Sequence, residues 1–182
     1  MLNLRRTAAP AELPVTVDEV REHCRVDHYD DDLQLEAALL AAVDHLDGWF
    51  GILGRCLVTQ TWAFEVDRLC APVRLPFPDV TDAAIITDGG PVPVGAIEVV
   101  NDALGGLVRP VDGATWPDGR ATVQFTCGYG DPADVPRAIC FAIMLLAAHY
   151  YEHREAVVIG PAANELPLGV DRLVRPHTRV KL

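Results

Sequence analysis

Residues 134–153 read Asp-Val-Pro-Arg-Ala-Ile-Cys-Phe-Ala-Ile-Met-Leu-Leu-Ala-Ala-His-Tyr-Tyr-Glu-His, and this stretch decides the fold. Asp134 is placed to accept the free amide protons of a first helical turn, and Pro136 in that turn loses no hydrogen bond. From Ala138 to Ala148 no side chain is charged or polar, so the helix is predicted to be buried on every side. The run is shorter than the roughly 20 residues that cross a bilayer, so no membrane span is expected. The helix is either the central helix of a small core, or a partner chain covers part of it.

Two further helices are predicted upstream, within residues 14–54. Thr16 and Glu19 have the spacing of a capping box and start the first helix, and Asp31 and Gln34 have the same spacing at the start of the second. The second helix carries an apolar seam at alternating steps of four and three residues, formed by Leu39, Val43, Leu46, Phe50 and Leu53. Gly54 is the predicted stop, and the seam is expected to pack on the central helix.

Between residues 56 and 130 the apolar period changes from that of a helix to two, which indicates strands. The alternation is clearest from Val58 to Val66, and Val123, Phe125 and Cys127 are predicted to face a core. Further candidate strands are 73–75, 83–87, 92–100, 107–109 and 121–127, separated by glycine- and proline-rich turns. Gly128-Tyr129-Gly130 is predicted to be a strand-to-helix turn with positive φ.

These elements predict one α+β domain over residues 1–182. Its parts are helices one and two in 14–54, a β-rich insertion in 56–130, the central helix in 134–156, and a C-terminal segment and basic tail in 160–182. Residues 167–174 are expected to form a short C-terminal helix, so the fold is a small helical bundle with a β-rich insertion between helices two and three.

The composition favours a single globular domain that is made and used in the cytoplasm. Hydrophobic residues make up 50% of the chain, and the N-terminal Met-Leu-Asn-Leu-Arg-Arg is not followed by an apolar run of signal-peptide length. The cysteines are odd in number, with no C-x-x-C pair: Cys24, Cys56, Cys70, Cys127 and Cys140. We therefore expect small buried side chains, with neither a disulfide framework nor a thiolate metal site.

The charge is strongly acidic and unevenly spread. The formal net charge is -11, but residues 171–182 hold four basic residues against Asp171, which is +3 and leaves -14 for residues 1–170. An acidic body disfavours general binding of nucleic acid. The basic end is either a docking peptide for an acidic partner or a solvated terminus.

One motif points to an enzyme. His149, Glu152 and His153 match H-x-x-E-H, in which two histidines one helical turn apart bind zinc and the glutamate polarises a water. A third ligand is required, and the downstream candidates are Glu155, Glu165, Asp171 and His177. Because only 29 residues follow His153, the motif is better explained as a solvated helix end. A small zinc hydrolase is the alternative function of a different class.

No other catalytic or cofactor motif is recognised. The chain contains no G-x-S-x-G, P-loop or G-x-G-x-x-G pattern. Asp30-Asp31-Asp32 lacks the alternating ligands and the glycine of an EF-hand loop. We therefore predict no catalytic residue, no metal and no cofactor.

Several further motifs stand in a fixed order along roughly residues 10–175. They are Pro14–Val20, Cys24–Asp27, Gly54–Trp62, Gly128–Gly130 with Val135-Pro136, and His149–Glu152 with Arg154–Val157. In this order they resemble the head-to-tail connector (adaptor) proteins of long-tailed bacteriophages, a family that also serves phage-derived gene transfer agents. Thr59-Gln60-Thr61-Trp62 and the segment Tyr151–Glu155 are the more specific parts. His153 stands where the family has a different polar residue, which further disfavours zinc.

The resemblance implies a helical bundle interrupted by a β-rich region, and a structural role in the virion or particle neck after assembly in the bacterial cytoplasm. Connectors form a ring, usually a dodecamer, under the portal protein, and stopper or tail-completion proteins attach to it. Such a cyclic ring requires two different lateral faces on each subunit. A tail-completion protein of the same particle is the alternative within this class.

Two site hypotheses follow from the resemblance. DNA would cross the lumen without specific binding, which suits an acidic body, and Asp30, Asp31 and Asp32 are candidates to line it. The C-terminal segment would dock on the portal, through basic side chains that pair with carboxylates and a terminal leucine in an apolar notch. These docking residues are Arg172, Arg175, Arg179, Lys181 and Leu182.

Overall fold

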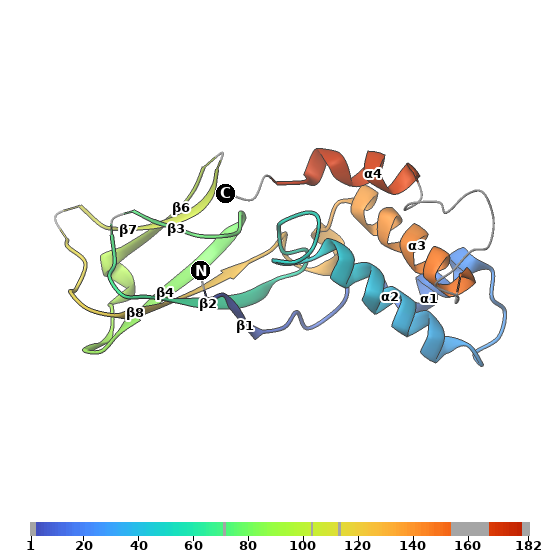
Figure 1. Cartoon of the computed structure of the whole chain (residues 1–182), viewed down its shortest axis with the longest axis horizontal. Coiled ribbons are helices and arrows are strands. Elements are labelled where there is room, and N and C mark those ends of the chain that lie inside the picture. Colours follow the sequence, from blue (N-terminus) through green and yellow to red (C-terminus); the bar gives the residue numbers. More distant parts are fainter. Residues whose placement is uncertain (1–2, 71, 103, 113, 154–167, 180–182) are drawn as a thin grey trace. The chain divides into compact units, whose positions relative to one another are not determined.

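The computed structural model describes residues 3–70, 72–102, 104–112, 114–153 and 168–179, which form two compact units. The β unit comprises the described residues of 3–12 and 56–130, and the helical unit those of 13–55 and 131–179. The predicted α+β class is confirmed, with the β-rich region inserted between the second and third main helices (Figure 1). Within the described residues, no helix is both long enough and apolar enough to cross a membrane.

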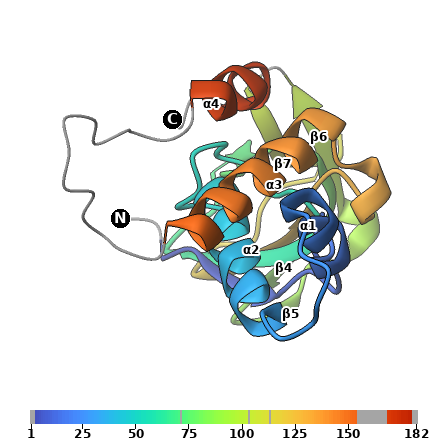
Figure 2. The same cartoon turned by 90° about the vertical axis from the view of Figure 1, so that its right-hand side faces the viewer.

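The described helical unit is built from α1 (Val17–Cys24), α2 (Asp32–Leu46), α3 (Arg137–Glu152) and α4 (Leu168–Val174). The central helix α3 packs against the other three, and α1 also packs on α2. Figure 2 shows α3 lying between α2 and α4. The fully buried large side chains of α2 and α3 are Leu35, Leu39, Leu46, Ile139, Ile143 and Leu146. Each contributes about 1.5–3 kcal/mol by leaving water, so this seam holds the unit together.

The start of α1 confirms the predicted capping box. The amide of Glu19 donates to Thr16 Oγ1 over 3.2 Å, and the amide of Thr16 donates to Glu19 Oε2 over 2.7 Å. At the other end Arg25 adopts the left-handed conformation (φ 57°), which lets the amides that follow the helix reach its last carbonyls.

The start of α2 differs from the prediction in one respect. Asp31 is the residue that precedes the helix, as expected, but its side chain makes no cap with Gln34. The Asp31 carboxylate instead accepts a hydrogen bond from the hydroxyl of Tyr151, at the end of α3. The predicted second capping box is therefore wrong, because the Asp31 carboxylate is hydrogen-bonded to Tyr151 of another helix.

The end of α2 was also predicted wrongly. The helix stops at Leu46, and the chain then doubles back so that the amide of Leu53 donates to the carbonyl of Leu46 over 3.3 Å. Gly51 permits this return, since a Cβ there would lie 2.3 Å from the carbonyl oxygen of Asp47. Leu53 is buried as predicted, but through this fold-back; Phe50 is 92% exposed and does not belong to the seam.

The central helix begins at Arg137, and the predicted cap at Asp134 is wrong. Asp134 lies in a short 3-10 turn, where its Oδ2 accepts from the amide of Asp131 over 3.0 Å. Val135 follows this turn with extended backbone (φ -69°, ψ 129°), as expected for a residue that precedes proline. Pro136 is therefore the N-cap and not a residue of the first turn.

The burial of α3 is one-sided. Its buried side chains are Ile139, Ala142, Ile143, Leu146 and Ala147. Phe141 has 43% of its surface exposed, and its ring forms a T-shaped pair with the ring of His23 at a centroid distance of 5.8 Å. This chain alone therefore does not bury α3 on every side, and cover by a partner chain stays a prediction.

The β unit holds two antiparallel sheets. The order of the first is β1-β2-β8-β4-β5 and that of the second is β3-β7-β6. The strands are β1 (Arg5–Ala8), β2 (Gln60–Val66), β3 (Val73–Arg74), β4 (Val80–Thr87), β5 (Gly90–Pro91), β6 (Ile97–Asp102), β7 (Gly105–Pro110) and β8 (Ala121–Cys127). The predicted strand 92–100 is divided, because a 3-10 turn at Val94–Ala96 precedes β6.

Aromatic rings pack together in the core of the β unit. Trp62 on β2 lies 5.2 Å from Phe77, and Phe77 lies 6.1 Å from Phe125 on β8, measured between ring centroids. Val123, Phe125 and Cys127 are buried, as their alternation along β8 predicted. β8 pairs along its length with both β2 and β4 and is therefore the middle of the larger sheet.

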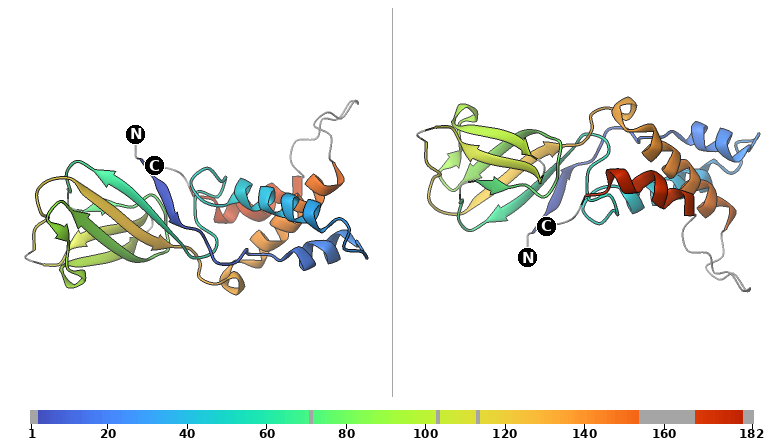
Figure 3. Two further views of the ribbon diagram at one scale, coloured as in Figure 1. Left: turned by 90° about the horizontal axis from the view of Figure 1, so that it is seen from below. Right: turned by 90° about the horizontal axis from the view of Figure 1, so that it is seen from above.

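The smaller sheet is fixed onto β4 by polar and steric contacts (Figure 3). The side-chain amide of Asn101 on β6 donates to the carbonyl of Val80 over 2.8 Å and accepts from its amide over 3.0 Å. Gly106 on β7 lies so close that a Cβ would be 2.5 Å from Val80 Cγ2. The close approach of the two sheets therefore depends on a glycine.

The two ends of the inserted segment are hydrogen-bonded to each other within the β unit. The amide of Thr59 donates to the carbonyl of Gly130 over 2.9 Å, and the amide of Tyr129 donates to that of Leu57 over 3.0 Å. Gly128 and Gly130 have φ of 136° and 132°, so the predicted positive-φ turn is confirmed. The entering and leaving segments are thereby held side by side.

Candidate interaction surfaces

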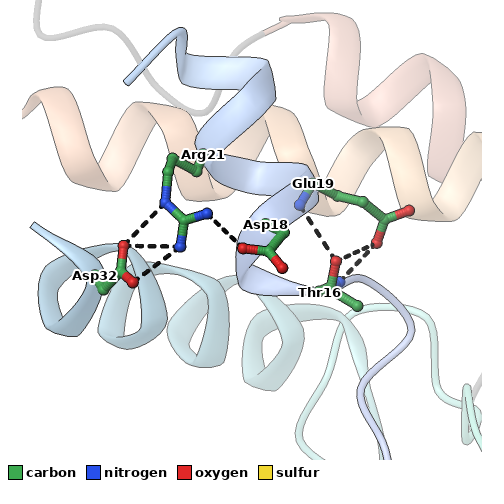
Figure 4. Close-up of polar contacts among 5 residues, drawn as sticks. All are labelled: Thr16, Asp18, Glu19, Arg21 and Asp32. Atoms are coloured by element: carbon green, nitrogen blue, oxygen red, sulfur yellow. Dashed lines mark hydrogen bonds and ion pairs between the residues drawn. The ribbon is translucent and has the colours of Figure 1, made fainter. Parts of the chain in front are cut away.

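One corner of the helical unit is tied together by Arg21 on α1 (Figure 4). Its Nε and one terminal nitrogen donate to the two carboxylate oxygens of Asp32 over 3.0 and 2.9 Å, and its other terminal nitrogen bonds Asp18. The guanidinium also lies 4.5 Å from the ring centroid of Tyr29. The hydrogen bonds to Asp18 and Asp32 raise the pKa of Arg21, so the cation persists and joins α1 to the start of α2.

This arrangement changes the interpretation of the three consecutive aspartates. Asp32 pairs with Arg21 and Asp31 accepts from Tyr151, so both carboxylates serve the fold. Asp30 is exposed. Among the residues that the structure describes, no three histidine, cysteine or acidic side chains converge as a metal site would require. Of the three candidates for a DNA-facing surface, Asp30 has the clearest access to solvent.

The outward side of α2 is apolar. Leu33, Ala37, Leu40 and Ala41 are exposed and share one helix face, which we call the α2 stripe. Leu33 is 80% exposed and Leu40 45%. Because α2 also buries apolar residues on its inward side, it is apolar on two opposite faces. The helical spacing of these four residues is visible in the sequence, but the predicted seam covers only the inward face of α2.

The predicted docking residues fall into two groups. Arg172 on α4 and Arg175 in the following 3-10 turn are exposed, while Val170 and Val174 of the same helix are buried. Further on, the backbone amide of Arg179 donates to the carbonyl of Leu53 over 2.9 Å. Lys181 and Leu182 lie outside the described residues. Arg172 therefore belongs to a helix docked on α3 and Arg175 to the turn that directly follows it, and neither belongs to a separate peptide.

The H-x-x-E-H residues lie at the end of α3. The rings of His149 and His153 are 4.5 Å apart between centroids, and His153 Nδ1 is 3.0 Å from the carbonyl oxygen of His149. His149 is half-buried, and Glu152 and His153 are exposed. Of the third-ligand candidates, Asp171 lies on α4 and His177 in the 3-10 turn after it, and Glu155 and Glu165 lie outside the described residues.

Comparisons with known proteins identify the fold. Neither the protein-family models nor the curated proteins gave a match. Among solved structures, a chain from the neck of an empty gene transfer agent particle, computed with C6 symmetry, matches with a TM-score of 0.77 and 24% identity. The match covers 98% of this chain and 96% of that chain.

Two further solved structures agree. A chain in the virion of a native gene transfer agent particle gives a TM-score of 0.74, with 24% identity and coverage of 99% and 97% of the two chains. A chain in the neck of a native particle, computed with C12 symmetry, gives 0.66, with 24% identity and coverage of 100% and 97%. The chain therefore shares a fold with these particle proteins over nearly its whole length.

Proposed function

We propose that this chain is a structural head-to-tail connector that forms a ring in the neck of a phage or phage-like particle. The observation that supports this most strongly is the match to a neck chain over 98% of this chain and 96% of the other. Both units are included in that match, so the likeness is more than a shared helical bundle. The C6 and C12 symmetry of the matched neck assemblies is what a ring of such subunits requires.

In this role the surfaces of the chain, and not a reactive centre, do the work. A formal charge of -11 lets packaged DNA pass without being held, since a basic lumen would retain phosphate. We propose no catalysis for the H-x-x-E-H segment. Replacing His149 and His153 together by alanine tests this: loss of stoichiometric zinc or of a hydrolytic activity would support the hydrolase instead.

Portal docking is the second part of the proposal. Because Arg172 lies on the docked helix α4 and Arg175 in the turn directly after it, we assign docking first to the end of the chain from Arg179 onward, including Lys181 and Leu182. A chain truncated after Arg179 keeps α4, its buried Val174 and the backbone hydrogen bond from Arg179 to Leu53, so it tests docking by Lys181 and Leu182 without removing a contact of the helical unit. We expect weaker binding to the portal; binding of unchanged strength would reject the anchor.

The connector role is tested in the particle. A host strain that lacks the chain is expected to produce DNA-filled or emptied heads without tails, and a tagged copy should be located between head and tail by electron microscopy. Cross-linking then separates the two candidate positions: links to the portal support the connector, and links only to tail proteins support a tail-completion protein. Tailed, infectious particles that form without the chain would overturn the proposal.

A further inference from the structure

The outward face of α2 has the features of a protein contact that the isolated chain leaves open. The α2 stripe lies directly opposite the buried side of the helix, and its Leu33 is 80% exposed. Phe50, in the turn that follows α2, is 92% exposed. Single exposed apolar residues are common, but a helix face with two exposed leucines and two alanines, followed by an exposed phenylalanine, is typical of an interface.

The surroundings of the stripe define the chemistry of its partner. From Tyr29 to Phe50 the sequence contains six carboxylates and no lysine or arginine. Glu36 and Asp44 are exposed on the same outward side of α2, among the apolar residues. These carboxylates repel nucleic acid and anionic lipid. The partner must therefore present a protein surface with cations at its edge.

Such a surface exists on the opposite side of the same unit. From Leu168 to Arg179 the chain has three arginines against Asp171. Arg172 and Arg175 are exposed one helical turn apart, beside the half-buried Leu173. Within the described residues, no ion pair is formed by either arginine. α3 lies between α2 and α4 (Figures 1 and 2), and each surface is on the exposed side of its helix, so we place the two surfaces on opposite sides of the helical unit.

Two complementary surfaces on opposite sides of one subunit are what a head-to-tail ring requires, because each subunit gives one face to each neighbour. We propose that the α2 stripe of one copy packs against the α4 surface of the next copy, with Glu36 and Asp44 pairing with Arg172 and Arg175. The stripe supplies apolar burial, and the charges set the direction and register of the contact. This inference rests on the proposed ring, and it assigns the helices that form the lateral contact.

A charge exchange in the full-length chain tests the pairing. The first variant carries Glu36→Arg and Asp44→Arg, the second carries Arg172→Glu and Arg175→Glu, and the third carries all four changes. The readout is the number of copies per purified particle, measured by quantitative mass spectrometry in a host that makes only the variant. We expect the copy number of each double variant to fall by about tenfold or more, equivalent to ~1.4 kcal/mol. The copy number of the fourfold variant should recover.

The apolar part is tested with a matched control. Leu40 on α2 and Ile86 on β4 are each 45% exposed, so Leu40→Ser and Ile86→Ser remove similar surface from different units. Only Leu40→Ser is expected to reduce incorporation. Circular dichroism and thermal unfolding of each purified variant confirm folding. If the variant with Glu36→Arg and Asp44→Arg does not fold, Glu36→Gln with Asp44→Asn takes its place.

The outcomes separate the two proposals. A wild-type chain that is absent from particles overturns the connector role, and the lateral contact with it. A wild-type chain that is incorporated, together with variants that are incorporated equally well, overturns the α2–α4 contact alone. Double variants that fail without recovery in the fourfold variant also overturn the pairing.

Discussion

The Sγ atom of Cys127, at the end of β8, lies 3.3 Å from the Sγ atom of Cys56, at the start of the inserted segment. Both side chains are buried and neither forms a disulfide, so the pair packs inside the β unit as two small apolar groups joined by a weak hydrogen bond. The expectation of buried cysteines is confirmed for these two and is wrong for Cys70, which is exposed.

The first prediction concerns thiol reactivity. Cys70 should react first with a maleimide at neutral pH, because it is the exposed cysteine. Burial raises the pKa of Cys24 and of Cys140, which lowers their thiolate fraction and should make them react more slowly. Cys56 and Cys127 should react only after unfolding. Pulse labelling with peptide mass spectrometry measures the order, and labelling of Cys127 at the rate of Cys70 would contradict it.

The second prediction concerns a buried polar side chain in the β unit. Gln60 is buried and accepts a hydrogen bond from the indole Nε1 of Trp62 over 3.1 Å. Gln60→Leu leaves this N–H buried without its acceptor, so we expect a loss of roughly 1–3 kcal/mol in the free energy of unfolding. Denaturant titration followed by tryptophan fluorescence measures it. Gln124→Leu, on the partly exposed side of β8, is the control and should change stability by about 0.5 kcal/mol or less.

The third prediction concerns the turn after α2. Gly51→Ala places a methyl group 2.3 Å from the carbonyl oxygen of Asp47, and backbone cannot move aside easily. We expect destabilisation by about 1–3 kcal/mol, with increased exchange of the Leu53 amide, which bonds the end of α2. Gly95→Ala is the matched control, since a Cβ there meets nothing within 4 Å. Equal stability of the two variants would show that the turn adapts.

The fourth prediction concerns pH. The Arg74 guanidinium donates to Asp102 Oδ1 over 2.7 Å and holds the pKa of that carboxyl below its usual value. A depressed pKa in the folded state gives stability that is present above the unfolded pKa, about 3.9, and is lost as pH falls through the folded value. Arg74→Met should raise the pKa of Asp102 and weaken the acid dependence of unfolding below about pH 4. Carbon-detected NMR titration of Asp102 gives the pKa directly; an unchanged value would exclude Arg74 as the cause.

Some of the fold could be predicted because the signal is local. The box between Thr16 and Glu19 involves residues three apart, and the alternation along β8 reports the two faces of one strand. The glycines at 128 and 130 mark a turn that needs positive φ. In each case the residues that carry the pattern are also the residues that make the contact.

The predictions of local structure are wrong where residues distant in the sequence determine the conformation. Asp31 has the spacing of a capping residue, but Tyr151 reaches its carboxylate from another helix. The strand β1 consists of Arg5, Arg6, Thr7 and Ala8, all exposed, so no alternation identifies it, and pairing with β2 alone makes it a strand. The predicted seam of α2 includes Phe50 because its spacing from Leu46 fits a helix, but α2 ends at Leu46.

The interaction surfaces were predicted only in part. The basic residues near the C-terminus are visible as composition, but their division between a docked helix and the end of the chain depends on the burial of Val170 and Val174. To predict the α2 stripe from the sequence, one must know which side of α2 faces α3. A helix with apolar residues on two opposite sides offers two possible seams, and the sequence alone does not say which one the chain itself covers.

The outer strands of the five-stranded sheet have a consequence for the protein before assembly. β1 carries two arginines on its exposed surface, and β5 is two residues long and ends in Pro91, so neither border is a good template for a strand from another molecule. The borders of this sheet are therefore poor starting points for fibrillar aggregation. Protection against edge-to-edge pairing is thus built into the sheet, independently of the helices that we assign to ring formation.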